Sequence, residues 1–285
     1  DVASPGVVLS ISPDGTTIVL SDPVRKVITL ESSSGSVIST YGGVGVRAAW
    51  APDGQTVYIT TGTVTTQQTP TTPAVIAPGN QVLVYSGNTG WTPVTDTVPA
   101  SDVAVTVPSV GAYFAGSPTT ARGYCAASTV NSASGTPTTT NSFYPPADTA
   151  PTQTDRIAAT NDGLHVLGAT VTPTPTLSDL HVTIPSGACP ATGGLTFSNT
   201  LTTSVLSGVN ATAITGVIPT SDSALAFITY TGSGGILPAY APAASGPGTT
   251  TYIQLSGTAT APIKGVESSD NSMFYVGTSG DDLVH

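Results

Sequence analysis

The sequence predicts an all-β fold, and three observations support this prediction. Thr, Ser, Val and Gly dominate the 285 residues, whereas the good helix formers Glu, Lys and Met occur two, two and one times. The 31 Gly and 24 Pro residues are typical of a chain with many turns. Short apolar runs separated by these turn residues recur along the chain. Apolar residues still make up 39% of the chain, which is enough to build a sizeable core.

The first repeated unit, residues 7–41, contains four expected strands: VVLSI, TTIVLSDP, KVITLESSSG and SVISTY. A second unit follows the same plan with VRAAW, TVYITTG, NQVLVYSGNTG and WTPVTDTV. In both units a Pro-Asp-Gly turn, at 13–15 and at 52–54, follows the first strand. Proline presets φ in such a turn and glycine accepts a positive φ. Four antiparallel strands in each repeat indicate a β-propeller, which is built from four-stranded blades.

Later units are more degenerate, but we place their first hairpins at 103–116, 156–170, 213–230 and 263–278. The equivalent turn residues are then Gly15, Gly54, Gly111, Gly163, Ser223 and Ser272. A bare blade takes about 40 residues, so most units carry insertions. We expect one domain over 1–285 with about five complete blades and a partial one. Because a blade that stopped at His285 would leave an unpaired edge, we expect a fragment of a longer chain, as in a seven-bladed ring.

Four insertions rich in Thr and Pro interrupt the repeats. They are 63–79, 129–154, 171–178 and 232–248. We place 129–154 after a third strand and the others after second strands, and expect all four to decorate one face. Loops on a rigid scaffold often bind partners, so this face is the predicted recognition surface, with Tyr240, Phe143 and Tyr144 as contacts. The alternative is that these loops are solvated or glycosylated spacers without a ligand.

No catalytic, cofactor or metal residues are predicted. His165 and His181 alternate with apolar residues, as strand side chains do, and His285 is the last residue. Aspartates recur in the hairpin turns, where a carboxylate bonds to the backbone of its own turn. They are Asp14, Asp53, Asp162, Asp222 and Asp270. The local acidic cluster of Asp270, Asp281 and Asp282 leaves metal binding there as an alternative.

The two cysteines, Cys125 and Cys189, are predicted to form one disulfide. Their surroundings, GYCAAS and GACPAT, lack the paired spacing and nearby histidines of a metal site. Two free buried thiols are the alternative.

The charge balance excludes several partners. The net charge is −10 and the pI is about 4.2, and the six basic residues are scattered. Nucleic acid is therefore an unsuitable partner, because nothing forms a basic patch that could neutralise phosphates. No apolar run approaches the 18 residues of a membrane-spanning helix, so we expect no membrane insertion.

The SPDG and APDG turns, followed by TTIVLSDPVRKVITLESSSGSVIST in the first unit, resemble bacterial surface propellers of the YVTN type. That family is related to WD-repeat and lactonase-like propellers. Where the family has YVTN, this chain has IVLS at 18–21 and YITT at 58–61. The resemblance implies an exported protein, at the cell surface, outside the cell or in the periplasm.

We therefore expect a non-catalytic binding or structural module whose partner is a protein, a carbohydrate or a copy of itself, without a cofactor. One alternative is a lactonase-like hydrolase with its site in the central channel. Two or more carboxylates and a histidine at the channel mouth would indicate that activity. Another alternative is a self-assembling surface or filament subunit.

Overall fold

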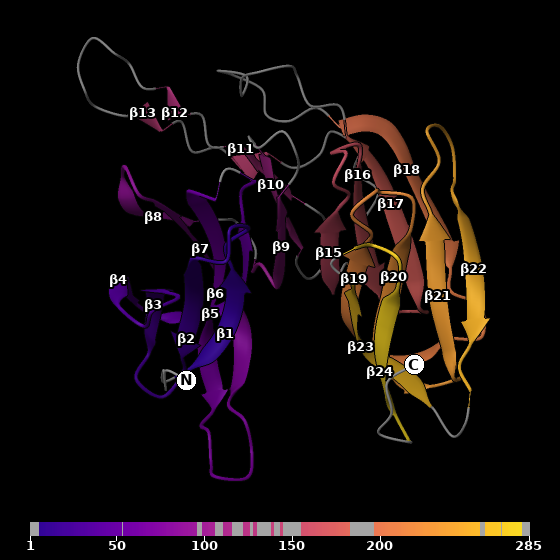
Figure 1. Ribbon diagram of the computed structural model, residues 1–285, viewed down its shortest axis with the longest axis horizontal. Coiled ribbons are helices and arrows are strands. Elements are labelled where there is room, and N and C mark those ends of the chain that lie inside the picture. The colour runs from indigo at the N-terminus through magenta and orange to yellow at the C-terminus, as the bar shows by residue number, and fades with distance from the viewer. Residues whose placement is uncertain are drawn as a thin grey trace.

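The computed structural model confirms the all-β class, with strands grouped into sheets that follow one another around the molecule (Figure 1). The structure describes residues 6–52, 54–95, 99–105, 111–115, 122–125, 128–129, 138–139, 143–144, 155–182, 197–256, 260–268 and 270–280. Within these ranges, no helical segment has the length and hydropathy needed to cross a membrane.

Five sheets contain four antiparallel strands each, and we call each sheet a blade. Blade one contains β1 (Val7–Ile11), β2 (Thr17–Asp22), β3 (Val27–Ser32) and β4 (Val37–Gly42). Blade two contains β5 (Val44–Trp50), β6 (Thr56–Thr66), β7 (Val75–Ser86) and β8 (Gly90–Thr95). Blade three contains β9 (Asp102–Val105), β10 (Gly111–Ala115), β11 (Arg122–Cys125) and β14 (Phe143–Tyr144).

Blade four contains β15 (Arg156–Ala159), β16 (His165–Thr170), β17 (Thr176–Val182) and β18 (Phe197–Val205). Blade five contains β19 (Asn210–Pro219), β20 (Ala226–Ser233), β21 (Ile236–Ala241) and β22 (Thr249–Gln254). The sixth sheet, which we call blade six, pairs β23 (Ala261–Glu267) with β24 (Phe274–Ser279), and a small separate sheet pairs β12 (Ser128–Thr129) with β13 (Thr138–Thr139). Five four-stranded blades and a partial sixth, predicted from the repeats, are thus found in the described part of the chain.

The first strand of each blade is the innermost one. Along the chain, β1 contacts β5, β5 contacts β9, β9 contacts β15, β15 contacts β19, and β19 contacts β23. In Figure 1, blades one and two lie on the left and blades five and six lie on the right. β9 and β15 lie between these two groups, farther from the viewer. The innermost strands therefore surround the central axis of the propeller.

The core lies between neighbouring blades. Val19, Ile28 and Leu30 of blade one pack with Val57 and Ile59 of blade two. Trp50 packs against the same cluster, as expected for a tryptophan between two blades. Similar clusters join blade two to three, four to five and five to six. Because a middle strand is covered on both faces, all six residues of β16 are buried.

The hairpin aspartates act as predicted, and a hydroxyl two residues earlier completes each turn. Asp14, Asp162, Asp222 and Asp270 accept hydrogen bonds from Ser12, Thr160, Thr220 and Ser268 at 2.5–2.6 Å. Each carboxylate also accepts a backbone N–H two residues later. Asp53 lies outside the described residues.

Two of the predicted turn positions need correction. In blade six the residue with positive φ is Asn271, at 59°, rather than Ser272. Gly111 is the first residue of β10, whereas Gly15, Gly54, Gly163 and Ser223 have the positive φ that the turn requires.

The four insertions do not share one face, which corrects the prediction of a single crown of loops. Antiparallel strands alternate in direction, so connections from second to third strands leave one face and those from third to fourth strands leave the other. The segments 63–79 and 171–178 lie at second-to-third connections, as predicted. The segment 129–154 contains β13 and β14, and its part before β14 belongs to the connection from the third strand, β11, to the fourth strand, which is on the opposite face. Most of its residues lie outside the described ranges.

The segment 232–248 is not a loop insertion. It contains the whole of β21, which pairs with β20 and β22, and the remaining loop 242–248 joins a third strand to a fourth. The loop interpretation came from residues typical of loops, namely Gly232 and Gly234 before β21 and Pro238 within it. The insertion 63–79 is a hairpin: β6 and β7 stay paired as far as Thr66 and Val75. Figure 1 shows this β6–β7 hairpin projecting at the bottom of the molecule.

Candidate functional site

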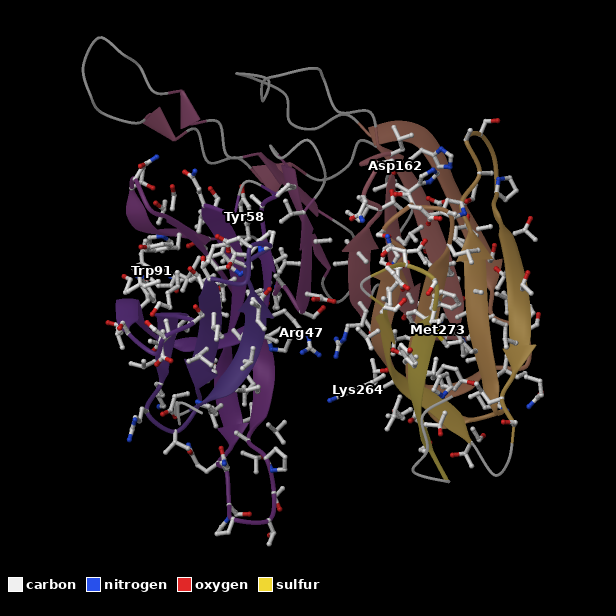
Figure 2. All side chains as sticks on the ribbon, viewed as in Figure 1. Arg47, Tyr58, Trp91, Asp162, Lys264 and Met273 are labelled. Carbon is white, nitrogen blue, oxygen red and sulfur yellow. The ribbon has the colours of Figure 1, made fainter. Side chains whose placement is uncertain are left out.

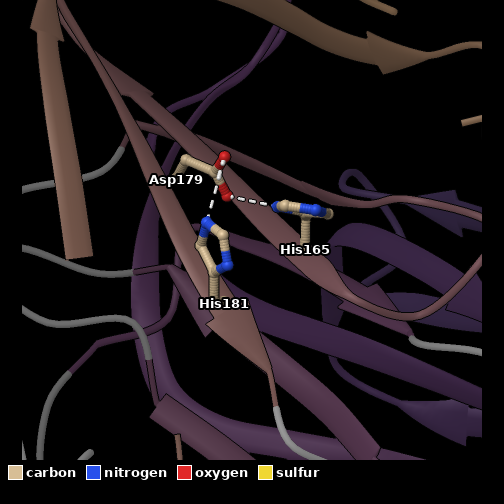
Figure 3. A group of neighbouring side chains, drawn as sticks. All are labelled: His165, Asp179 and His181. Atoms are coloured by element: carbon tan, nitrogen blue, oxygen red, sulfur yellow. Dashed lines mark hydrogen bonds and ion pairs between the residues drawn. The ribbon is translucent and has the colours of Figure 1, made fainter. Parts of the chain in front are cut away.

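A cluster of titratable side chains lies on the second and third strands of blade four. His165 of β16 pairs directly with His181 of β17, and Asp179 precedes His181 by two residues. Residues opposite one another and two apart along a strand project to the same face of a sheet. The register of this hairpin therefore brings both imidazoles and the carboxylate together (Figure 3).

Asp179 lies at the centre of the cluster. Its Oδ1 is 2.8 Å from Nδ1 of His165, and its Oδ2 is 3.8 Å from Nε2 of His181. The two imidazole rings meet edge to face with centroids 4.5 Å apart. The Asp179 side chain is 1% exposed, and the His165 and His181 side chains are 5% and 12% exposed.

Tyr240 of β21 connects this cluster to blade five. Its hydroxyl donates a 2.7 Å hydrogen bond to Oδ2 of Asp179 and accepts one of 3.0 Å from the backbone N–H of Gly248. Burial, reinforced by the hydrogen bond to Asp179 and its negative charge, raises the pKa of Tyr240 to about 12. The hydrogen bond that His165 makes to Asp179 is the main cause of a raised pKa of His165, and burial opposes this rise. Tyr240 is therefore a neutral hydrogen-bond donor at physiological pH.

The cluster has the donors of a transition-metal site. His165, Asp179 and His181 each offer one ligand atom, and these atoms lie within 4.8 Å of one another. Imidazole and carboxylate suit Zn²⁺ and similar ions. The 2.8 Å separation of the His165 and Asp179 atoms is that of a hydrogen bond, and Tyr240 already occupies the other carboxylate oxygen. In the arrangement seen, the cluster forms a hydrogen-bonded bridge between two blades.

The location of the cluster does not match the channel site expected of a lactonase-like propeller. β16 and β17 are the second and third strands of blade four, whereas the central axis is surrounded by the first strands. The cluster also contains one carboxylate rather than two or more. It therefore does not supply the set of residues that would indicate such a hydrolase.

The predicted loop contacts are only partly described. Tyr240 is 1% exposed, so its prediction as an exposed contact is wrong, because it lies in β21 and faces blade four. Phe143 and Tyr144 form the short strand β14, which pairs with β11, and their side chains lie outside the described residues. Cys125 ends β11 and Cys189 lies outside the described residues, so their disulfide stays a prediction.

A surface recess lies on the face with the second-to-third-strand connections. It is lined by Gly6, Val7, Asp22, Pro23, Val24, Arg25 and Gln68. Gln68 comes from the β6–β7 hairpin, and Pro23, Val24 and Arg25 come from the connection between β2 and β3. Val24 is 62% exposed and the Arg25 side chain 68% exposed, so this recess offers both apolar and cationic contacts to a partner.

No protein-family model and no curated protein sequence matches the chain. Among solved structures, a functionally unknown protein from Desulfotomaculum acetoxidans DSM 771 has a TM-score of 0.62 at 14% identity, covering 98% of this chain and 80% of that one. Kuenenia stuttgartiensis hydrazine synthase has a TM-score of 0.62 at 13% identity, covering 99% of this chain and 78% of that one. The β-propeller domain of Cps50 (Swd1) from Myceliophteria thermophila has a TM-score of 0.57 at 12% identity, covering 100% and 86%. These similarities show the β-propeller fold alone.

Proposed function

We propose that the chain is an exported, non-catalytic binding module of a bacterial surface protein, related in kind to the YVTN-type propellers. Its rigid scaffold is the row of blades, whose cores are shared between neighbours. The observation that carries the proposal is the β6–β7 hairpin, which extends well beyond the strands next to it (Figure 1). Loops held by a rigid scaffold commonly bind partners.

The recognition surface of this proposal is the face with the hairpin, and we name it the hairpin face. It comprises residues 63–79 together with the recess lined by Val24, Arg25 and Gln68. Residues 65–73 are all exposed and consist of Thr, Gln and Pro, so they present hydrogen-bonding groups without a net charge. This mixture of amide, hydroxyl, cationic and apolar groups fits a protein partner better than a charged polymer. A carbohydrate partner is the alternative.

A non-catalytic role agrees with the chemistry of the buried cluster. His165 and Asp179 form a pair like that of an acid–base catalyst, but Tyr240 and the packing of blade five cover them. A general base must reach a substrate proton directly or through one water. The inaccessible position of this pair supports a structural function for it.

Two experiments test the proposal. An antibody raised against residues 64–76 should label intact cells of the source organism as strongly as permeabilised cells, because the hairpin would lie on the outer surface. Labelling only after permeabilisation would contradict an exported surface module.

In the second experiment, purified protein is assayed for lactone and ester hydrolysis with and without Zn²⁺. Turnover that disappears in Asp179→Asn would contradict the non-catalytic assignment.

A further inference from the structure

Three of the six basic residues of this acidic chain occupy the same position in three different blades. In blades two, four, five and six, the first strand is followed by a turn that begins at Ala51, Thr160, Thr220 and Ser268. Four positions before these turn residues, and in the same order, lie Arg47, Arg156, Gly216 and Lys264. Each pairs with the residue nine positions after the start of its turn: Thr60, Ala169, Thr229 and Gly277.

The equivalence of these positions has a geometric consequence. Because the blades repeat around one axis, equivalent residues of the innermost strands stand at one level of that axis. A register irregularity immediately precedes Arg47, Gly216 and Lys264 in their strands. Such a bulge redirects the side chain that follows it. Figure 2 shows Arg47 and Lys264 extending from opposite sides of the molecule toward its centre.

Arg47 and Arg156 are close enough to act on each other electrostatically. Burial is the main cause that lowers the pKa of Arg156, and the positive charge of Arg47 lowers this pKa further. The Nη1 of Arg156 donates to the backbone carbonyl of Asp155 at 2.7 Å, whereas its buried Nε has no hydrogen-bond partner in the described part of the chain. Lys264 is exposed. Among the described residues, none of these three cations forms an ion pair with a carboxylate.

The acidic groups nearby neutralise only part of this charge. Asp102 of β9 accepts backbone N–H groups from Val103 and Ile157, which fixes it between blades three and four. Burial raises the pKa of Asp102, and the charges of Arg156 and Arg47 oppose this rise. The side chain of Asp155 accepts the backbone N–H of Val171. Arg47 and Arg156 thus lie near two carboxylates that are already hydrogen-bonded, and Lys264 holds the equivalent position in blade six.

We propose that Arg47, Arg156 and Lys264 form an anion-binding site on the propeller axis that takes a phosphate group. Guanidinium and ammonium groups are the donors that phosphate oxygens accept best, and these three residues hold equivalent positions on the innermost strands of their blades. An anion would also relieve the repulsion between Arg47 and Arg156 and give the buried Nε of Arg156 a partner. The phosphate is either the free ion or a group on a larger ligand. The proposal does not depend on the hairpin face.

Isothermal titration calorimetry with inorganic phosphate and with phenyl phosphate tests this proposal. We expect both probes to bind the wild-type chain, with an affinity that falls as NaCl is added. Tighter binding of phenyl phosphate would identify a ligand-borne phosphate group, and equal affinity would identify the free ion. Absence of binding by either probe would overturn the proposal.

Three variants make the test specific. Arg47→Gln and Lys264→Gln should each weaken phosphate binding at least about tenfold, because each removes a charged donor. Lys26→Gln is the matched control, since it removes the same charge from an exposed side chain in the connection between β2 and β3, outside the recess. Equal weakening by Lys26→Gln would show a general charge effect and overturn the proposal. If Arg47→Gln does not fold, the exposed Lys264 decides the outcome.

Discussion

At the residue scale, the contact between His165 and Asp179 makes stability depend on pH. The hydrogen bond to Asp179 raises the pKa of His165 in the folded state. A histidine with a raised folded-state pKa contributes its stability fully below the unfolded value of about 6.5, and this contribution is lost as the pH rises through the folded-state pKa. We therefore predict that the urea midpoint of the wild-type chain decreases as the pH is raised above about 6.5.

The matched variants for this prediction are His165→Gln and Asp179→Asn. Each removes one partner of the hydrogen bond, so the decrease above about pH 6.5 should vanish in both, although both are less stable overall. Urea titrations at a series of pH values measure the effect. A decrease of the same size in either variant would assign the pH dependence to another group.

The hydroxyls that complete the hairpin turns contribute to stability as well. Thr220 donates to Asp222 at 2.6 Å and accepts the backbone N–H of Leu225 at 3.0 Å. Thr220→Ala should lower the free energy of unfolding by about 1–2 kcal/mol, because the two hydrogen bonds of the buried Thr220 hydroxyl are lost. Thr249→Ala, at an exposed position of β22, is the control and should cost less than about 0.5 kcal/mol. Equal losses in urea denaturation would show that the turn hydroxyl has no special function.

At the element scale, the exposed part of the β6–β7 hairpin lies apart from the core of blade two. The described core of blade two uses Tyr58, Val82 and Val84, whereas residues 65–73 are exposed. Replacing residues 65–75 by Asn-Gly joins Val64 to Ile76, which already face each other across the hairpin. We predict that the free energy of unfolding changes by less than about 1 kcal/mol. A loss as large as that of a core deletion would show that the hairpin packs against the scaffold.

The elements that could be predicted from the sequence are those that local residues define. Turns 12–15 and 160–163 are closed by hydrogen bonds between residues three positions apart, so their motifs identify them directly. β21 was not predictable in this way. Its flanking glycines and Pro238 are typical of loops, and its place in the sheet depends on pairing with β22.

At the scale of the whole molecule, contacts between blades determine both candidate sites. Asp179 and Tyr240 are 61 residues apart and meet only because blades four and five pack together. Asp102 and Ile157, 55 residues apart, meet between blades three and four. The pairing of His165 with His181 could have been predicted from the sequence, because the two residues are equally distant from residue 173, which is the centre of their hairpin. A seven-bladed ring and export from the cell stay predictions.

We propose that the repeated blades form a non-catalytic scaffold that places Arg47, Arg156 and Lys264 at one level of the propeller axis. A crystal structure of the protein grown with selenate, a tetrahedral oxyanion that resembles phosphate and contains a heavy atom, would examine this arrangement. We expect six successive antiparallel sheets around one axis and an anomalous peak in contact with these three side chains. A different order of strands, or the same three side chains engaged by carboxylates with no anion beside them, would contradict it.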